Sequence, residues 1–413
     1  MSINPSIFRE YDIRGIYPDE LNEETAYKIG RAFAIYLREK KIAIGHDARI
    51  SSPILKKSFI EGARDEGVDV LDIGLATVDM VYFASGYFHL PAVMITASHN
   101  SKDWNGFKLM KSDVDFFSVR DLEVIINEDR KNSSQEKGAV TAEDIKNDYI
   151  KHVLGIIDIE KIRPMRIAID IKSDAVGQVF KSILEKLPVE ISAEHYHFGC
   201  AFDSDGDRAN FTDERGQAVS PSIIGALMAK YFLKKEPYGK IVYSATTGKI
   251  VADVITAYGG EGIREKVGHT FIERRLKEAD GLLGIEASGH YYFKKNFYAD
   301  SGIISFLTML DILSDENKSL SVLASEFNKY VSIPEMNFTV GNPEEVIKKI
   351  AQNFEGYDMD WLDGLSVRTP DFWLNLRLSN TEPLLRLNIE ATSEIILNRV
   401  KKNLISIIHP FIK

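Results

Sequence analysis

The strongest constraint on this chain is a pattern that occurs three times, in which a short apolar segment runs directly into a polar loop. Helical segments separate the apolar ones, and that alternation predicts βαβ units with mainly parallel sheets. Ligands of such sheets bind beyond the carboxyl ends of the strands, which is where the three loops fall. The loops are residues 96–100, 203–208 and 286–290, and a fourth polar loop, 377–382, lies near the C-terminus.

The spacing of apolar residues defines the three repeats. In the second repeat, Val176, Val179, Phe180 and Ile183 lie three or one positions apart and share one helical face. Similar helical patterns cover residues 54–63 in the first repeat and 250–258 in the third. The expected strands are 42–45, 68–73 and 92–95, then 167–170 and 200–202, then 240–243 and 282–285.

The C-terminal region has a different pattern. Residues 372–377 and 385–389 alternate like half-buried strands, and helices are expected at 343–355 and 394–408. The fold class is therefore α/β, with three similar mixed α/β domains, mainly parallel sheets and a smaller C-terminal α+β domain. The expected domains are 1–150, 151–238, 239–333 and 334–413, with the polar stretch 127–148 forming a helix or a linker.

Composition limits the partners of the chain. A hydrophobic content of 44% and a charged content of 27% are typical of a soluble globular protein. The formal net charge of −10 argues against nucleic acid or an anionic membrane as a partner. An anionic substrate would then need basic groups gathered at its site. Such groups lie in or beside the special segments: Arg9, Arg14, Lys108, Arg208, Arg377 and Arg386.

Cysteine usage and the N-terminus bear on the compartment. Cys200 is the only cysteine, so no internal disulfide can form, and we expect it to be a buried core residue. Charged residues stand where a signal peptide would need an apolar stretch. No apolar run approaches the roughly 18 residues needed to span a bilayer. We therefore expect a cytoplasmic protein.

Ser98 is the candidate nucleophile. His99 and Asn100 beside it could donate to a phosphate or fix the loop, whereas the plainer interpretation is a cap or turn serine. No Gly-x-Ser-x-Gly elbow is present, which argues against acyl transfer. A phosphorylated serine would carry a charge of about −2 and would need a cation beside it.

Asp203, Asp205 and Asp207 could hold that cation. Carboxylates at alternate positions around a glycine can turn their oxygens toward a hard metal such as Mg²⁺. A calcium-binding EF-hand is rejected, because Arg208 replaces its obligatory glycine and the flanks look like strands. A solvated acidic turn is the remaining alternative. Arg208 could neutralise a phosphoryl group in transfer.

The remaining loops suit a sugar and a phosphate. Glu286, with Ser288 and His290, could recognise vicinal hydroxyls, although a charged surface turn is the alternative. Neither a Walker motif nor a Gly-x-Gly-x-x-Gly after a strand is present, so nucleotide cofactors are not indicated. The fourth loop offers donors suited to a non-transferring phosphate: Arg377, Ser379, Asn380 and Thr381.

With these loops in this order, the chain resembles the α-D-phosphohexomutase family, and within it the phosphomannomutase/phosphoglucomutase branch. The resemblance covers nearly the whole length and includes residues 8–15, 105–108 and 267–269. It implies four domains around a central cleft and a Mg²⁺-dependent phosphoryl transfer between the 1- and 6-positions of a hexose. Ser98 would be the phosphoserine and a metal ligand beside the three aspartates. The implied substrate-binding residues are Tyr11, Arg14, His269, Glu286, Ser288, His290, Arg377, Ser379, Asn380, Thr381 and Arg386.

The resemblance also implies a mechanism. The phosphoserine gives its phosphoryl group to a hexose monophosphate, the hexose 1,6-bisphosphate turns around, and the opposite phosphoryl group returns to Ser98. Closure of the C-terminal domain would exclude water. Lys108 or His99 would give acid–base help, and Arg208 would complete the catalytic set.

Fewer residues bear on the substrate and the assembly. Ser379, Asn380 and Thr381 favour mannose or glucose phosphates, because phosphoglucosamine mutases usually have Ser-Gly-Thr there. The second repeat is shorter than in family members, and residues 171–174 replace their usual Asn-Gly turn. We expect a monomer or a homodimer that keeps activity with altered packing of that domain. The alternatives are a phosphoglucosamine mutase, a phosphatase, or a non-catalytic protein that binds sugar phosphates.

Overall fold

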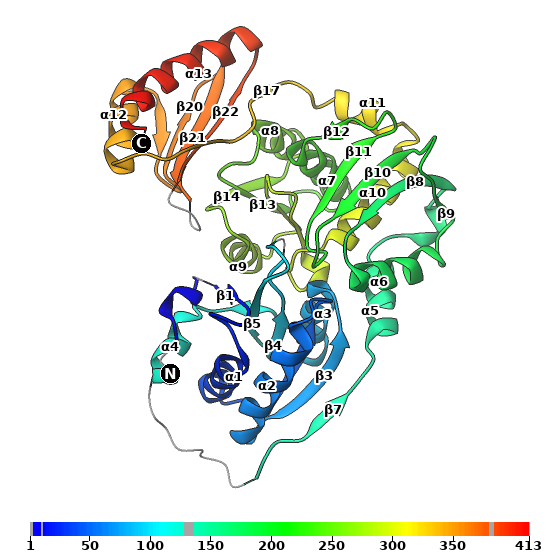
Figure 1. Ribbon diagram of the computed structural model, residues 1–413. Coiled ribbons are helices and arrows are strands. Elements are labelled where there is room, and N and C mark those ends of the chain that lie inside the picture. Colours follow the sequence, from blue (N-terminus) through cyan, green and yellow to red (C-terminus); the bar gives the residue numbers. More distant parts are fainter. Residues whose placement is uncertain (1–2, 10, 99, 128–135, 380–383, 413) are drawn as a thin grey trace. The chain divides into compact units, whose positions relative to one another are not determined.

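The computed structural model describes residues 3–9, 11–98, 100–127, 136–379 and 384–412. The chain forms two compact units, and Figure 1 labels their helices and strands. The first contains Met1–Gly216 and His290–Asn317, and the second contains Gln217–Gly289 and Lys318–Lys413. The predicted α/β class with mostly parallel sheets is confirmed, whereas the four domain boundaries stay a prediction.

The larger sheet of the first unit combines both strand directions. Strands β2, β3, β4 and β7 run parallel to one another, and β5 pairs antiparallel with both β4 and β1. The strands in spatial order are β1 (Asp12–Ile16), β5 (Trp104–Lys111), β4 (Ala92–Ile95), β2 (Lys41–His46), β3 (Asp69–Leu75) and β7 (Val140–Ala142), with β6 (Asp115–Phe116) paired to β5.

Helices cover both faces of this sheet. Helix α2 connects β2 to β3 on one side of it, and α3 connects β3 to β4 on the other side of β2. Because both crossovers are right-handed and run in opposite directions across the sheet, the two helices lie on opposite faces. The core between α1, α2 and the sheet is rich in aromatic rings, including Phe33, Phe59 and Phe107. The helices are α1 (Glu23–Leu37), α2 (Ser52–Asp65), α3 (Val78–Phe88), α4 (Arg120–Asn127) and α5 (Lys146–Leu154).

Within the region 127–148, which the sequence predicts to be a helix or a linker, the structure has a strand and the first residues of α5. The strand is β7, which pairs in parallel with β3 and extends the sheet by one strand. All three residues of β7 are exposed, so no apolar alternation marks the strand in the sequence. Its place in the sheet depends on backbone pairing alone.

The shortened second repeat forms a smaller sheet with an unusual crossover. Strands β9 and β10 both run parallel to β8, on opposite sides of it, yet only residues 192–197 connect them. Parallel strands normally require a connection of about a dozen residues or more, usually with a helix. Six residues leave no room for one. The strands are β9 (Val189–Ile191), β8 (Met165–Ile171), β10 (Phe198–Phe202) and β11 (Ala209–Asp213).

The two faces of this smaller sheet differ in polarity, because helices cover only one of them. One face is apolar and packs on α6 (Asp174–Leu184) and α10 (Gly302–Glu316), where Phe180 and Phe306 meet at 4.9 Å between ring centroids. On the opposite face, side chains are small or polar, and Arg166, Asp170 and Asn210 are exposed. The alternation in the sequence therefore matches a sheet that is covered on one side only.

A buried carboxylate connects three segments of the first unit. Asp79, at the start of α3, accepts hydrogen bonds from Tyr149 Oη at 2.6 Å and Asn296 Nδ2 at 3.1 Å, and from the Ser301 hydroxyl. These partners belong to α5, the 3₁₀ helix Lys294–Asn296 and the N-cap of α10. Because Asp79 is fully buried, its three donors satisfy a group that would otherwise be costly.

We predict that Asp79→Ala destabilises the first unit by about 3 kcal/mol, because it leaves three buried donors without their acceptor. Burial raises the pKa of Asp79 to about 6. Protonation therefore favours the folded state, and the Asp79 contribution to stability declines as pH rises from about 4 to about 6. The cost of the substitution should be larger at about pH 5 than at about pH 8. Urea unfolding at both pH values measures it, and equal costs would contradict the assignment.

The α/β part of the second unit has a parallel sheet with the order β14, β13, β15. The predicted strands 240–243 and 282–285 are β13 and β15, and the predicted helix 250–258 is α8. The elements are β12 (Ala218–Val219), α7 (Pro221–Lys235), β13 (Lys240–Ser244), α8 (Lys249–Ala257), β14 (Glu261–Glu265), α9 (His269–Ala279), β15 (Leu283–Ile285) and α11 (Leu320–Ser325), while β16 (Tyr291–Phe293) belongs to the first unit.

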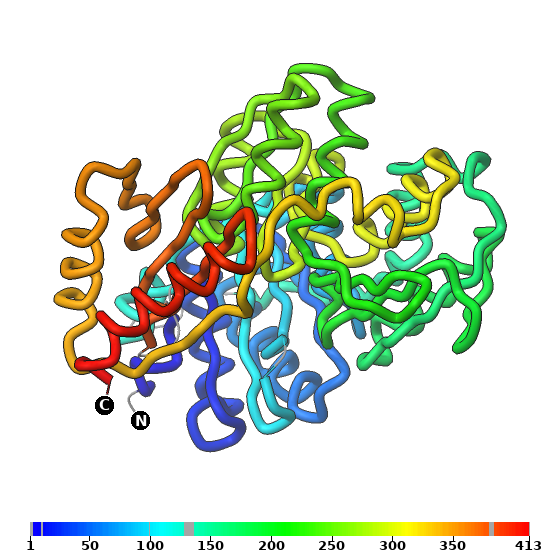
Figure 2. The backbone as a smooth tube through the Cα atoms, turned by 90° about the horizontal axis from the view of Figure 1, so that it is seen from above, coloured from blue at the N-terminus to red at the C-terminus, as the bar shows by residue number. Residues whose placement is uncertain are grey.

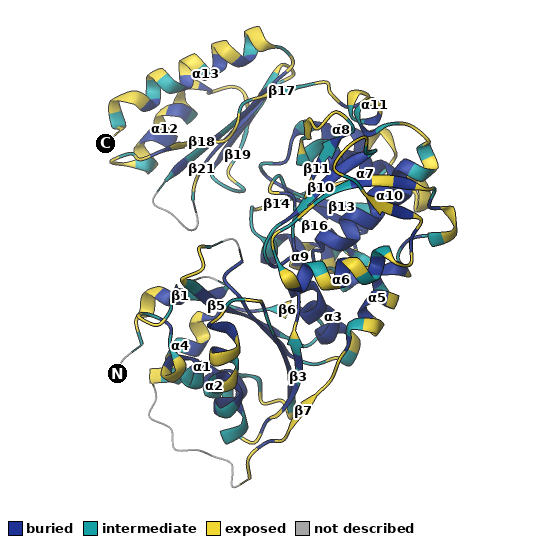
Figure 3. Cartoon of the chain, turned by 45° about the vertical axis from the view of Figure 1, so that its right-hand side comes forward, coloured by how far each residue is buried: buried dark blue, intermediate teal, exposed yellow. Residues whose placement is uncertain are grey.

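The C-terminal part is an antiparallel sheet with two helices on it. Figure 2 shows α12 and α13 side by side, and Figure 3 shows their exposed residues separated from the buried ones that contact the strands. Both helices were expected within two residues of their observed ends. The elements are β17 (Val331–Ser332), β18 (Met336–Phe338), α12 (Pro343–Asn353), β19 (Asp358–Asp360), β20 (Leu365–Arg368), β21 (Phe372–Leu378), β22 (Leu385–Ala391) and α13 (Glu394–Ile408).

Among the described residues, the helices include none with the length and apolar character required to cross a bilayer. Cys200 is buried in β10, as the sequence predicts. Burial raises the pKa of its thiol well above the ordinary value, which fits a core residue.

Candidate active site

The loop with Ser98 follows β4 directly, at the carboxyl end of the strand. Ser98 is 2% exposed, and its φ of 51° lies in the left-handed region that a serine adopts only when its surroundings hold it there. The Ser98 N–H donates to Thr96 Oγ1 at 2.9 Å. The backbone of the candidate nucleophile is thus fixed in an unusual conformation. His99 lies outside the described residues.

The aspartate loop follows β10 in the same unit and is fixed by its backbone. Val78 N–H, at the start of α3, donates to the Asp205 carbonyl at 3.2 Å, and Gly302 N–H, at the start of α10, donates to the Gly206 carbonyl at 3.1 Å. Gly206 has a φ of 82°, and a Cβ there would lie 2.9 Å from Val176 Cγ2. Glycine is therefore required at the turn that aims the three carboxylates.

Lys108 connects the domain that carries Ser98 to the aspartate loop. It lies on β5, and its Nζ is 2.9 Å from Asp207 Oδ2 and 3.1 Å from Asp205 Oδ2. Burial opposes its charge, but Asp205, Asp207 and Asp300 outweigh that effect and raise the pKa of Lys108. The lysine is therefore held as a cation. That state suits charge stabilisation or proton donation, not proton abstraction.

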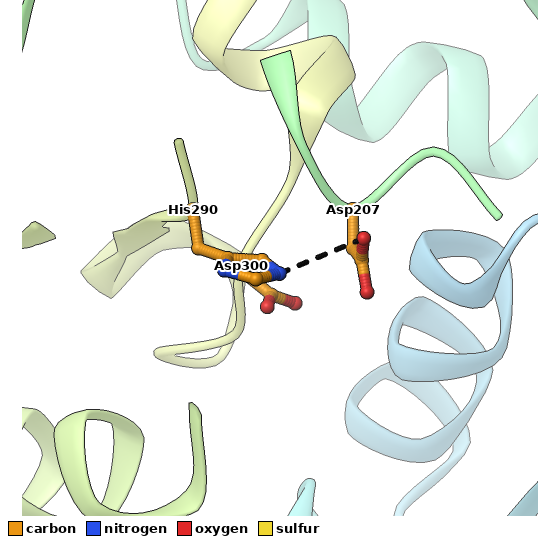
Figure 4. A group of neighbouring side chains, drawn as sticks. All are labelled: Asp207, His290 and Asp300. Carbon is orange, nitrogen blue, oxygen red and sulfur yellow. Dashed lines mark ion pairs between the residues drawn. The ribbon is translucent and has the colours of Figure 1, made fainter. Parts of the chain in front are cut away.

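Arg208 and His290 complete the charges around Asp207. Arg208 Nε is 3.1 Å from Asp203 Oδ2, and His290 Nε2 is 3.7 Å from Asp207 Oδ1. Figure 4 shows His290 pointing at Asp207, with Asp300 beside the imidazole. The sequence groups His290 with Glu286 and Ser288, but the structure places it in the first unit beside the aspartate loop.

The carboxylates in this cluster repel one another. Burial, together with the charges of Asp207 and Asp205, raises the pKa of Asp203 to about 9, and burial raises the pKa of Asp300 to about 8. Burial also works against ionisation of Asp207, but Lys108 and His290 outweigh it and hold the pKa of Asp207 below its ordinary value. Positive charge in addition to these side chains would relieve the repulsion.

The three aspartates fit a divalent cation. Asp203, Asp205 and Asp207 each offer an oxygen, and the three oxygens lie within 4.8 Å of one another. Asp205 Oδ1 and Asp207 Oδ1 are buried and accept no hydrogen bond from the described residues. Oxygen-only ligands of this kind suit Mg²⁺.

The second unit holds the residues expected to recognise the sugar. Glu286 is buried after β15 and accepts from the Gly268 N–H at 3.0 Å, which ties it to the segment carrying His269. The neighbouring Val267 N–H donates to Asp363 Oδ2 at 3.0 Å. The predicted loop 286–290 and the segment 267–269 are therefore brought together, with Ser288 on the same loop.

Two arginines predicted to bind a phosphate lie opposite each other in the C-terminal sheet. Arg377 on β21 and Arg386 on β22 are directly opposed partners in the antiparallel ladder. Burial lowers the pKa of Arg377, and the charge of Arg386 acts in the same direction. Like charges directly opposite each other destabilise a sheet. Carboxylates partly balance the pair, because Arg377 Nε lies 3.9 Å from Asp363 Oδ2 and Arg386 Nη1 lies 3.1 Å from Glu335 Oε1. Ser379 directly follows β21, whereas Asn380 and Thr381 lie outside the described residues.

Arg14 and Tyr11 lie in the first unit. Arg14 Nη1 donates to Asn100 Oδ1 at 2.8 Å and Nε lies 2.7 Å from Asp12 Oδ2, so this side chain reaches the Ser98 loop. Tyr11 is half-buried just before β1. A pocket of about 570 Å³ opens beside the same loop. Its lining includes Asn100, Lys102, Arg49, Lys172, Ser173 and Ser204.

Sequence models of one family match most of the chain. They describe phosphoglucomutase/phosphomannomutase domain I over residues 5–136, domain III over 220–330 and the C-terminal domain over 335–407. A phosphomannomutase from Escherichia coli is 33% identical, covering 94% of this chain and 95% of its own length. The chain belongs to the phosphohexomutase family. It is a hexose-phosphate mutase, an isomerase.

Other relatives support the same family for this phosphohexomutase. A phosphomannomutase from Methanocaldococcus jannaschii is 34% identical over 94% of both chains. The solved structure of a phosphoglucomutase/phosphomannomutase family protein from Burkholderia thailandensis matches with a TM-score of 0.87 and 27% identity, covering 98% of this chain and 97% of that one. The short crossover of the second repeat is thus compatible with the family fold.

Three residues near the site were missed from the sequence, because they belong to none of the motifs that were used. Asp47 and Arg49 follow β2, and Asp300 precedes α10. One available signal was position, because β2 neighbours β4 and both end at the same edge of the sheet. Asp300 offers no comparable signal, since its neighbours in the site come from distant parts of the chain.

Proposed function

We propose that this phosphohexomutase interconverts mannose 6-phosphate and mannose 1-phosphate, and also accepts glucose phosphates, through a phosphoserine at Ser98. Hexose 1,6-bisphosphate would be the intermediate and activator. The observation that carries this proposal is the contact of Lys108 with Asp205 and Asp207, because it couples the serine-bearing domain to the metal-binding candidates. The relatives named phosphomannomutase favour mannose phosphates.

Each half-reaction conserves the phosphoryl group. A sugar hydroxyl oxygen bonds to the phosphorus of phosphoserine while the bond between phosphorus and Ser98 Oγ breaks. Lys108, held as a cation, is suited to donate a hydrogen bond or proton to the departing Ser98 oxygen. The hydroxyl proton must pass to a neutral base, a role we assign to His99. After reorientation, the other phosphoryl group returns to Ser98 by the reverse transfer.

The substrate contacts divide by chemistry. Glu286 and Ser288 would bind sugar hydroxyls, and Arg377 with Arg386 would bind the phosphate that is not transferred. Tyr11, Arg14, His269, His290, Ser379, Asn380 and Thr381 complete the proposed set. Mg²⁺ held by Asp203, Asp205, Asp207 and the serine phosphate would neutralise charge that builds on the transferring group. Arg208 would share that task.

The phosphoserine can be located directly. The chain is incubated with Mg²⁺ and glucose 1,6-bisphosphate, digested, and examined by mass spectrometry for a phosphate on the peptide containing Ser98. Coupled assays with mannose 1-phosphate, glucose 1-phosphate and glucosamine 1-phosphate then rank the sugars. A phosphate on another residue would refute the phosphoserine assignment, and preference for glucosamine phosphate would refute the sugar assignment.

We predict that EDTA abolishes turnover and that Mg²⁺ restores it. Asp205→Asn should raise the Mg²⁺ concentration required for half-maximal activity by at least about tenfold, because it removes one buried anionic ligand. Asp170→Asn is the matched control, since Asp170 is an exposed aspartate on the sheet that carries the loop. An unchanged Mg²⁺ requirement in Asp205→Asn would place the metal elsewhere.

A further inference from the structure

The loop that follows Ser98 is held from inside by one arginine. Arg49 lies in the loop after β2, and its side chain is 11% exposed. Its Nη2 donates to the carbonyls of Ser98 at 2.7 Å and Asn100 at 2.9 Å. Its Nη1 donates to the carbonyls of Ser101 at 2.7 Å and Trp104 at 3.1 Å. One side chain thus binds four carbonyl groups of one loop.

A second set of contacts fixes Arg49 itself. Its Nε donates to Asp47 Oδ2 at 3.1 Å and its backbone N–H donates to Asp47 Oδ1 at 3.0 Å. Ser52, at the start of α2, donates to the same Asp47 Oδ1 at 2.6 Å. Asp47 is 4% exposed. The guanidinium is therefore anchored to the start of a helix before it reaches the loop.

These contacts use all five N–H donors of the guanidinium, one at Nε and two at each terminal nitrogen. A lysine has three donors on a single nitrogen and no planar fork, so it cannot reproduce the arrangement. Binding a cation to neutral carbonyls also stabilises the loop more than neutral hydrogen bonds would.

We infer that Arg49 is a positioning residue for phosphoryl transfer, which sets the orientation of Ser98 without taking part in the chemistry. Ser98 adopts its left-handed φ of 51° between two fixed points, because its N–H donates to Thr96 and its carbonyl accepts from Arg49. Loss of the contact between Arg49 and the Ser98 carbonyl releases the strained backbone of Ser98. The nucleophile then samples orientations that are unproductive for in-line transfer. This inference rests on the proposed role of Ser98 as the phosphoserine.

Kinetics of Arg49 variants test the inference. We expect Arg49→Lys and Arg49→Ala to lower kcat by about a hundredfold while KM changes by less than about threefold, because the loss is one of orientation. Guanidinium ions at millimolar concentration should restore part of the activity of Arg49→Ala and none of that of Arg49→Lys. Arg64→Ala is the matched control, since Arg64 also donates to a loop carbonyl, that of Gly138 at 2.7 Å.

The outcomes are distinct. Wild-type kcat in both Arg49 variants would overturn the inference, and so would a loss of activity that matches a lower urea midpoint and is not rescued by guanidinium. Mapping of the phosphate by mass spectrometry separates a failure of the proposed function from a failure of the inference about Arg49. Wild-type chain without phosphate on Ser98 would overturn the proposed function and this inference together. Phosphorylated wild type with fully active Arg49 variants would overturn this inference alone.

Discussion

Ser98→Ala is expected to lower kcat for hexose-phosphate interconversion by about four orders of magnitude or more, because it removes the hydroxyl that we propose carries the phosphoryl group between the two half-reactions. The substitution removes one oxygen and keeps a side chain of similar size, so the φ of 51° should persist. Binding of the hexose phosphate should change little, since the proposed phosphate contacts lie on Arg377 and Arg386. Coupled assay and equilibrium binding measure the two effects separately.

Ser101→Ala is the control for the Ser98 variant. Ser101 is exposed, belongs to the same loop, and contributes its backbone carbonyl to Arg49. It should retain nearly full activity. A Ser98→Ala variant with more than about a tenth of wild-type kcat would place the nucleophile elsewhere. Steady release of inorganic phosphate by the wild type, without sugar interconversion, would instead indicate a phosphatase.

Features set by local sequence were predictable. The helix expected at 394–408 is α13 with the same ends, because a serine caps its start and its buried residues recur with helical spacing. Strands 42–45 and 92–95 were recognisable as β2 and β4 because both are continuous apolar segments in a buried parallel sheet. The polar loops were visible for the same reason, since each interrupts such a segment abruptly.

Features that depend on pairing between distant segments could not be predicted from the sequence. Strand β7 consists of exposed residues and belongs to the sheet only through β3. His290 lies two residues after Ser288 in the sequence, yet the chain returns to the first unit at this residue and places the imidazole beside Asp207. No spacing rule reports where a chain crosses between two compact units.

Arg49 shows the same limit at the level of side chains. Its partners are backbone carbonyls, which every residue possesses, so the sequence of the loop 98–104 carries no record of the contact. Asp300 is comparable, because its importance depends on the approach of Lys108, His290 and Asp207 from other segments. The residues that react can be inferred from chemistry, whereas the residues that hold them require the fold.

Lys108→Met is expected to destabilise the metal-free first unit by about 3–5 kcal/mol, because it leaves Asp205 and Asp207 buried without the ammonium that contacts both. Mg²⁺ should recover part of this loss by supplying positive charge to the same carboxylates, so it should stabilise the variant more than it stabilises the wild type. Urea unfolding followed by hydrogen exchange of β5 and β10, with EDTA or with Mg²⁺, measures both effects.

The sign of the pH dependence gives an independent check on Lys108→Met. Burial opposes ionisation of Asp207, and Lys108 is the largest of the charges that lower its pKa, so without the lysine this pKa rises and stability falls as pH increases through the interval between the unfolded and folded values. Lys111→Met is the matched control on the same strand, where the ammonium lies 5.5 Å from the Tyr36 ring centroid and has no role among the aspartates. Its loss should be within about 1 kcal/mol. A Lys108 variant as stable as this control would mean that Asp205 and Asp207 are neutralised by protonation. The prediction of a pre-formed Mg²⁺ site would then be wrong.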